Sequence, residues 1–472
     1  MTARAFALCL LVLALDARAA GAPRYALRYD EATRSMQVEA CLDAAAAQVR
    51  FAGDGSATRS LARFARTGGG AIAREGAAWV ARDWRAGECL HYRADLGALA
   101  AAQPRRGIDA RGDALVSDPA SWLLEPDDAD DVLVRVELPD GVALSAPWVP
   151  LAPGDGAARY RIPRTPDAWM GRIALGRFQT RALRLPGGTL HVALLGHPDA
   201  TQRERLLAWL GRVGDVAVRA FGRLPIGDVQ VLVAPVGAQR DAVVFGQSLR
   251  GQGNGLTLFV DVAQPSSAFE QDWIAPHELS HLFHPSLGER GAWLAEGLAT
   301  YYQNVLRARA GLMSPEHAWR AFEAGFARGR DASRGSALPT LEAASTRMGE
   351  DRAYMRVYWS GAAFWLGAEL EWRRRGLPAL DARLQAFAQC CLDPPRSWTP
   401  RDFVGRLDRL GGGDVLAPMF ESWRVRTDFP RTDALHAALG LRHAGDALRL
   451  DDGAAFRQLR EAIMHPSASA SR

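Results

Sequence analysis

The chain has 472 residues, of which 48% are hydrophobic and 23% are charged, and its formal net charge is +4. This length is enough for two or three domains with substantial cores. The near balance of charge excludes a strongly basic surface, so we expect no nucleic-acid partner. Every cationic side chain is Arg, which together with the Ala and Gly content indicates a coding bias and not a function.

Residues 1–20 have the pattern of a secretory signal peptide. Arg4 supplies the positive start, residues 5–15 form an apolar core, and Ala17-Arg18-Ala19 gives a cleavage site with small side chains. A buried N-terminal helix is the alternative. No later stretch approaches the ~18 apolar residues of a membrane span. We therefore predict a periplasmic or secreted protein with no stable membrane insertion.

Residues 21–185 are predicted to form an N-terminal β domain. Polar and apolar residues alternate over 25–29, 36–42 and 131–138, and turn-forming residues separate many such runs. Numerous short strands of this kind indicate a β-sandwich-like domain. Residues 100–130 are irregular and are expected to hold long loops.

Four cysteines remain after removal of the signal, since Cys9 lies within it. In an exported protein, Cys41 and Cys89 could form a disulfide, although two buried free thiols fit the sequence almost as well. Cys390 and Cys391 are adjacent in sequence. Because a vicinal disulfide is strained, we expect no bond between them, with one side chain buried and the other facing elsewhere.

From residue 186 the pattern becomes α+β, and the region 186–312 is predicted to be the catalytic domain. The expected order is strand, helix, strand and strand, at 189–195, 200–221, 228–234 and 256–262. Residues 313–465 are predicted to be mostly helical, and 466–472 to form a disordered tail.

A Gly-rich stretch at 246–255 lacks the spacing of a phosphate-binding loop. It fits a flexible loop and, equally well, a loop and edge strand beside a cleft, where an extended peptide could add as a strand. Farther on, Ser267-Ala268-Phe269-Glu270 resembles a helix capping box.

The segment His277-Glu278-Leu279-Ser280-His281 is the most informative part of the chain. Helix positions i and i+4 lie on one face, so both imidazoles can ligate one Zn²⁺, and Glu278 can reach the water that completes such a site. Pro285 is expected to end this helix by His284. Taken alone, the motif also fits a helix with two surface His and a solvated Glu.

A second predicted helix at 292–309 carries Glu296, the candidate third ligand. Two His and one Glu leave a fourth position open, which is typical of a catalytic zinc site. Thr300 and Asn304 follow Glu296 at i+4 and i+8. They could hold the ligands in place, or they could be ordinary helix packing.

Two other residues compete as ligands. His284 shares a helix face with His277, but it lies roughly 10 Å farther along the axis, too far for both to bind the same ion together with His281. Glu289 falls in a predicted loop beside Arg290. The sequence therefore favours His277, His281 and Glu296.

Tyr358 is the candidate donor to the oxyanion that peptide hydrolysis creates. It opens a strongly apolar helix at Tyr358-Trp359-Ser360-Gly361, from which a phenol could point into a cleft. The alternative is a hydroxyl in solvent. Tyr354, Tyr301 and Tyr302 compete for the same role.

These segments resemble the gluzincin metallopeptidases. The resemblance rests on His277–His281 followed by Trp293–Tyr302, and on Tyr358–Gly361, which is similar to the Tyr-containing helix of the glycyl aminopeptidase family and its aminopeptidase N relatives. The order of regions is similar too, with a β domain, a thermolysin-like catalytic domain and then helices.

The resemblance implies one Zn²⁺, Glu278 as general base and Tyr358 as a transition-state stabiliser. This chain departs from the family in several ways. The span from His281 to Glu296 is short, Ser360 stands where Lys is common, and no PDZ-like domain follows. The motif GAMEN, whose Glu grips a free α-amine, is absent.

We therefore predict an exported zinc-dependent peptidase that acts on peptide or protein substrates and is aminopeptidase-like. The alternatives are another zinc hydrolase on the same scaffold and a catalytically inactive peptide-binding protein. The intact set of His277, Glu278, His281 and Glu296 argues against the inactive alternative. The sequence does not indicate an oligomeric state.

Overall fold

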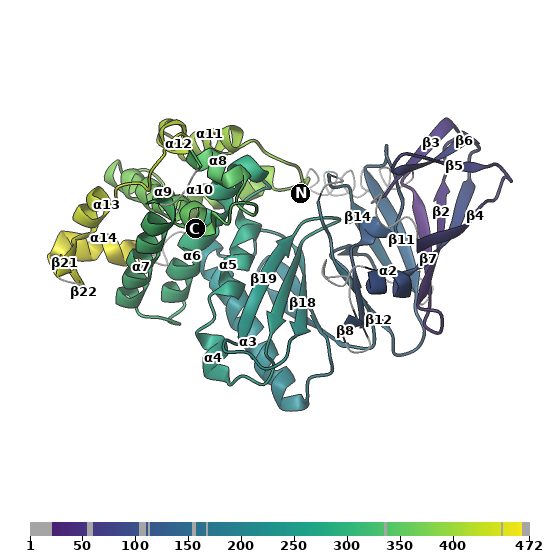
Figure 1. Cartoon of the computed structure of the whole chain (residues 1–472), viewed down its shortest axis with the longest axis horizontal. Coiled ribbons are helices and arrows are strands. Elements are labelled where there is room, and N and C mark those ends of the chain that lie inside the picture. Colours follow the sequence, from purple (N-terminus) through teal and green to yellow (C-terminus); the bar gives the residue numbers. More distant parts are fainter. Residues whose placement is uncertain are drawn as a thin grey trace, which may run out of the picture.

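The computed structural model describes residues 21–53, 60–102, 110–111, 114–152, 157–166, 169–334, 338–444 and 447–464. The predicted signal peptide and the predicted C-terminal tail lie outside the described residues. The chain forms a β-rich N-terminal part, a central sheet with helices, and a helical C-terminal part (Figure 1). This mixed architecture agrees with the predicted α+β class. The finer description as sandwich-like and thermolysin-like domains stays a prediction.

The described residues of the N-terminal part form three sheets, with strand orders β13-β14-β11-β1-β2-β7-β4, β10-β3-β6-β5 and β12-β15-β9-β8. Their strands are β1 Arg24–Asp30, β2 Ser35–Leu42, β3 Ala46–Ala52, β4 Leu61–Arg66, β5 Ile72–Glu75, β6 Ala78–Trp84, β7 Glu88–Asp95, β8 Ala110–Arg111, β9 Ala114–Ser117, β10 Glu125–Pro126, β11 Asp131–Glu137, β12 Ala143–Ser145, β13 Val149–Pro150, β14 Ala158–Pro163 and β15 Ile173–Gly176. Alternating burial along β7 and β11 explains why their sequences alternate. Short elements, including α2 Leu96–Ala102 and η3 Pro119–Ser121, occupy part of the region predicted as long loops.

Both cysteine pairs are bonded. Cys41 and Cys89 lie directly opposite each other on β2 and β7, and their sulfurs are 2.00 Å apart, which settles the alternative left open by the sequence. The prediction for Cys390 and Cys391 was wrong, because their sulfurs are 2.05 Å apart and joined. Cys391 is buried and Cys390 exposed, as expected. Neighbouring Cα atoms are always close, so bonding depends on side-chain directions at the end of a helix, which sequence does not specify.

The central sheet has the order β16-β17-β18-β20-β19. Its strands are β16 Gln179–Leu185, β17 Gly188–Leu194, β18 Asp228–Pro235, β19 Val243–Leu249 and β20 Gly255–Val260. The three inner strands are parallel and the two edges antiparallel. Helix α3, Ala200–Phe221, connects β17 to β18 and begins with a capping box between Asp199 and Gln202. Part of the Gly-rich stretch lies in β19, so the edge-strand alternative holds for residues 246–249.

The remaining elements are mostly helical, as predicted. They are α4 Ser266–Glu270, α5 Ile274–Ser280, η4 His281–Phe283, η5 Glu289–Gly291, α6 Ala292–Arg309, α7 Pro315–Arg334, α8 Leu341–Thr346, α9 Tyr354–Arg374, α10 Leu380–Cys391, α11 Pro400–Gly411, α12 Leu416–Arg424, α13 Asp433–Leu439, the hairpin β21 Leu441–Ala444 and β22 Ala447–Leu450, and α14 Ala454–Met464. No helix of the described residues is both long and apolar enough to cross a membrane. The predicted capping box at Ser267 does not form, because Pro265 precedes α4 and no side chain caps it.

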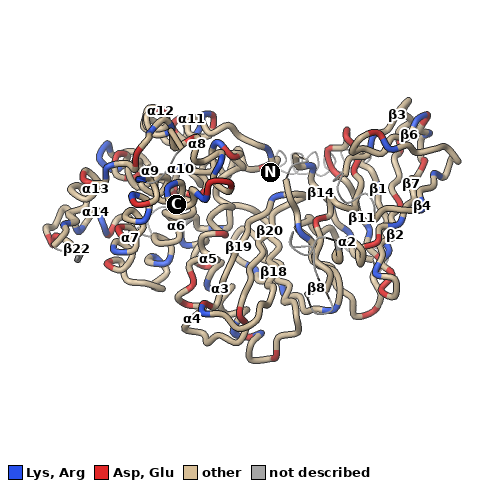
Figure 2. The backbone as a smooth tube through the Cα atoms, viewed as in Figure 1, with Lys and Arg blue, Asp and Glu red and all other residues tan. Residues whose placement is uncertain are grey.

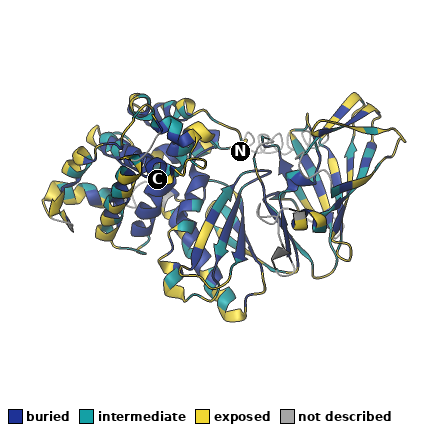
Figure 3. Cartoon of the chain, in the orientation of Figure 1, coloured by how far each residue is buried: buried dark blue, intermediate teal, exposed yellow. Residues whose placement is uncertain are grey.

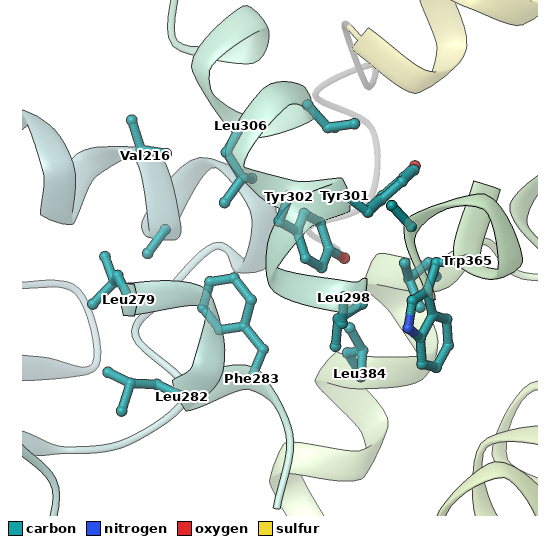
Figure 4. Close-up of a cluster of buried hydrophobic side chains, with 14 of the residues drawn as sticks. Val216, Leu279, Leu282, Phe283, Leu298, Tyr301, Tyr302, Leu306, Trp365 and Leu384 are labelled. Atoms are coloured by element: carbon teal, nitrogen blue, oxygen red, sulfur yellow. The ribbon is translucent and has the colours of Figure 1, made fainter. Parts of the chain in front are cut away.

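One hydrophobic core joins the central sheet to the C-terminal helices across the predicted boundary at residue 312. Buried faces of α5, α6 and α9 meet in it (Figure 3), and Figure 4 shows Leu279 and Phe283 packed beside Tyr302 of α6. Arg and acidic residues are interspersed along the chain (Figure 2), in keeping with its small net charge.

Helices α6 and α9 approach each other through two glycines. A Cβ on Gly297 would overlap the backbone of Gly361, and a Cβ on Gly361 would overlap the carbonyl oxygen of Trp293. These neighbours are backbone atoms, so they cannot rotate away. The distance between the two helices is therefore set by the absence of side chains at both positions.

We predict that Gly361→Ala lowers the free energy of unfolding by about 2–3 kcal/mol, because overpacking against backbone forces the helices apart. Gly367→Ala on the same helix is the matched control, since its nearest neighbour would be Met419 Cε at 3.5 Å. Alanine should be neutral or slightly stabilising there through its higher helix propensity. Urea unfolding curves measure both changes, and equal stabilities for the two variants would contradict this account of the helix contact.

Candidate metal centre

Helix α5 is held at its N-terminus by Asp272. The carboxylate accepts hydrogen bonds from the backbone N–H groups of Ile274 (2.8 Å) and Ala275 (3.0 Å). Pro276 sits in the first turn, where a missing N–H is harmless. Burial raises the pKa of Asp272 to about 6. This cap fixes the residue at which α5 starts. The start in turn determines which side chains of α5 face α6.

The other end of α5 passes into the short helix η4 at His281 and stops before Pro285, as predicted. The half-buried Arg250 donates from its guanidinium to the backbone oxygens of His281 and His284, the latter at 2.9 Å. Burial lowers the pKa of Arg250 to about 10, so it remains a cation at neutral pH. A cation at a helix C-terminus satisfies carbonyls that have no intrahelical partner.

The structure brings the three predicted ligands together. His277 Nε2 lies 3.2 Å from Glu296 Oε2, and His281 Nε2 lies 3.5 Å from the same oxygen. Ligand atoms of all three residues lie within 4.8 Å of one another. Tetrahedral bonds of about 2.0–2.1 Å to zinc place two ligand atoms roughly 3.3–3.4 Å apart. The observed arrangement therefore fits one zinc ion with little adjustment.

Hydrogen bonds on the far side of each imidazole fix its tautomer. His277 Nδ1 donates to Gln303 Oε1 at 2.9 Å, which leaves the lone pair on Nε2. His284 Nδ1 donates to the backbone oxygen of Pro285 at 2.7 Å, so its Nε2 accepts from His281 Nδ1 at 3.1 Å. Burial holds the pKa of His284 well below its usual value and keeps it neutral. Both ligand imidazoles thus direct Nε2 toward Glu296, and Nε2 can bind a metal once it carries no proton.

The charge at the centre matches this arrangement. Burial alone would raise the pKa of Glu296, but His281 and His277 outweigh it and hold that pKa well below its ordinary value. Glu296 is therefore a carboxylate at neutral pH. Burial alone would lower the pKa of His277, but before a metal binds, Glu296 and Glu278 raise it. Metal binding requires both imidazoles to be deprotonated, and two such imidazoles with one carboxylate form a donor set that zinc prefers.

Several predicted or competing residues lie elsewhere. No hydrogen bond joins Thr300 or Asn304 to the ligands among the described residues: Asn304 Nδ2 donates to the backbone oxygen of Thr300 at 3.4 Å, and Thr300 Oγ1 has no partner. Gln303 takes the orienting role instead. It lies at i+7 from Glu296, on the same helix face, and this periodicity is the signal that could have identified it. Glu289 is exposed on η5, outside the converging set.

Tyr358 is the tyrosine that adjoins the centre. Its ring stacks on His277, with ring centroids 5.8 Å apart and an interplanar angle of 18°. Burial, followed by the charge and hydrogen bonding of Glu296, raises its pKa and keeps the phenol protonated. By contrast, Tyr302 donates to Asp381 at 2.6 Å, and Tyr301 is buried in the core.

Glu278 faces the edge strand β19. Ser248 Oγ lies 2.6 Å from the backbone oxygen and 3.0 Å from Oε2 of Glu278, so its hydroxyl can hydrogen-bond to either. A Cβ on Gly246 would overlap Glu278 Cγ, so the strand backbone lies directly against this side chain. The Gly-rich stretch thus borders the centre.

Two exposed aromatic side chains lie beside the centre, one against His277 and the other against Tyr358. Trp273 is 46% exposed and its ring stands edge-on to His277, with centroids 6.0 Å apart. Tyr354 is 40% exposed and lies edge-on to Tyr358. Large exposed apolar groups beside a polar centre are typical of a site that binds apolar parts of a ligand.

Solved structures share this fold. The aminopeptidase N family protein of Idiomarina loihiensis matches with a TM-score of 0.65 at 12% identity, over 89% of this chain and 78% of that protein. The M1 zinc metallopeptidase of Deinococcus radiodurans gives 0.52 at 15% identity, over 87% and 94%. Yeast LTA4 hydrolase gives 0.55 at 12% identity, over 89% and 70%. At these identities the matches show that the chain shares the fold of these proteins.

Residues 273–364 match the model of the M61 glycyl aminopeptidase family. The matched segment contains all three ligands, Glu278 and Tyr358. The resemblance to glycyl aminopeptidases inferred from sequence is thus confirmed over this segment. No curated protein sequence matches the chain.

We predict that Gln303→Leu weakens zinc binding about 10- to 100-fold, because His277 loses the acceptor that orients it. Thr300→Val is the matched control on the same helix, since it replaces a hydroxyl without a hydrogen-bond partner by a methyl group of similar size. Competition with a chromophoric chelator measures both affinities. Unchanged affinity in Gln303→Leu, or an equal loss in Thr300→Val, would contradict the assigned role of Gln303.

Proposed function

We propose that this protein is an exported, zinc-dependent peptidase, aminopeptidase-like, with one catalytic zinc ion held by His277, His281 and Glu296. The observation that carries the proposal is the convergence of these three groups with both imidazole tautomers fixed toward one point. The M61 family match over this segment and the shared fold of zinc metallopeptidases support peptide hydrolysis.

The reaction would divide its roles among nearby side chains. Zinc, when bound, lowers the pKa of water toward neutrality and polarises a carbonyl group. Glu278 takes the proton of the attacking water and passes it to the leaving amine. Tyr358, protonated beside His277, donates a hydrogen bond to the oxyanion that develops on the substrate carbonyl. Ser248 holds Glu278 in place from β19.

The substrate is proposed to be a peptide that lies along β19, an antiparallel edge strand with its outer side unpaired among the described strands. Strand β19 contains no acidic residue that could bind a free α-amine, unlike the GAMEN motif. The aminopeptidase-like mode therefore rests on the family match. Comparing hydrolysis of free and N-acetylated peptides with the same sequence distinguishes exopeptidase from endopeptidase action.

Export is proposed from the signal-like pattern of residues 1–20, and the disulfide between Cys41 and Cys89 supports it. Such bonds persist mainly in oxidising compartments such as the periplasm or the extracellular space.

We predict that Glu278→Gln retains zinc but lowers kcat about 100- to 10,000-fold, because the amide cannot accept the proton. Peptide turnover and metal content of the purified variant measure the two effects separately. Full hydrolysis by the variant would exclude Glu278 as general base. A zinc-loaded native protein that binds peptides without cleaving them would instead favour the inactive peptide-binding alternative.

We further predict that Tyr358→Phe lowers kcat about 100- to 1,000-fold with little change in KM or zinc content, since the lost hydrogen bond acts on the transition state. Tyr354→Phe is the matched control, because this neighbouring phenol is exposed and does not contact the ligands. Steady-state kinetics give kcat and KM for both variants. Equal kcat values for the two variants would contradict the role of Tyr358 as oxyanion donor.

A further inference from the structure

A second cluster of metal-binding side chains lies in the C-terminal helical part, on elements other than those of the catalytic centre. Glu323 belongs to α7, His436 to α13 and His443 to β21, which lie together at one end of the molecule (Figure 1). Ligand atoms of the three residues lie within 4.8 Å of one another. The donor set, two imidazoles and one carboxylate, is the same as at the catalytic centre.

The carboxylate of Glu323 is positioned to act as a ligand. Arg330 Nη2 donates to its Oε1 at 2.6 Å, which fixes the group and leaves Oε2 for another partner. Oε2 is buried, and the neighbouring His436 Nε2 is close but not aligned for a hydrogen bond of good geometry. Although burial alone would raise its pKa, His436 and Arg330 hold the pKa of Glu323 below its usual value, so the group is ionised.

Both imidazoles face this carboxylate. His436 Nε2 lies 2.8 Å from Oε2, and His443 Nε2 lies 3.5 Å from Oε1. His436 is mostly buried, whereas the side chain of His443 is 51% exposed and can adjust its position. A metal ion would satisfy the buried oxygen and replace contacts that are incompletely aligned.

We propose that Glu323, His436 and His443 form a second divalent-metal site, that it binds Zn²⁺, and that the ion connects α7 to the C-terminal segment. The ligand number and types suit zinc, and the exposed side of His443 gives the ion access and leaves room for water. The proposal does not depend on the peptidase function, because none of these residues touches the catalytic centre.

The test is the zinc stoichiometry of the full-length protein after stripping with a chelator and dialysis against micromolar free zinc. We expect two ions per chain in the native protein, one in His436→Ala and one in His281→Ala, which removes a catalytic ligand. His317→Ala is the matched control, since this exposed histidine of α7 lies outside the cluster, and it should keep two ions.

A second measurement guards against loss of folding in the buried His436 variant. His443→Ala changes a half-exposed side chain, and its circular dichroism without metal should equal that of the native protein while its zinc content falls to one. In the His281→Ala background, Co²⁺ should still give a visible absorption band, which disappears when His443→Ala is added. One ion in the native protein, or two in both cluster variants, overturns the proposal.

Discussion

The close approach of α6 and α9 is the constraint on which the catalytic centre depends. Glu296 precedes Gly297 on α6, and Tyr358 lies one turn before Gly361 on α9. Because neither glycine has a side chain, the helix backbones touch, and this contact places the ligand carboxylate near the phenol. The negative charge of Glu296 raises the pKa of Tyr358, as expected for two groups that lie close together. The chemistry assigned to these two residues therefore follows from backbone packing between two long helices.

Around this contact, each histidine ligand is oriented by a residue outside the set of three ligands. Gln303 holds His277, His284 holds His281, and Arg250 holds the carbonyls that follow the helix. Gln303 belongs to α6, His284 follows η4 and Arg250 follows β19, so the centre is fixed from several directions. Such outer hydrogen bonds determine tautomer and ring direction, which decide whether a pair of histidines can bind a metal at all.

Sequence predicted the parts of this arrangement that depend on local order. The spacing of His277 and His281 and the bounds of α6 follow from helical periodicity and nearby Pro and Gly residues. Contacts between residues of different elements could not be predicted from local sequence patterns. Arg250 reaches α5 from a loop after β19, and the cap of α5 comes from Asp272 and not from the residues that resembled a capping box. The bond between Cys390 and Cys391 could not be predicted either, although the two are neighbours in sequence, because it depends on the directions of their side chains.

The shortness of α5 has a consequence for how the protein acquires its metal. With seven residues, this helix is too short to persist in an isolated chain. Its stability comes from Asp272, from Arg250 and from burial against α6, all of which require the folded structure. An unfolded chain therefore presents scattered histidines and no preformed site. At the proposed zinc site, folding would therefore precede metal binding, and the metal supply of the compartment where the chain folds would determine which ion it receives.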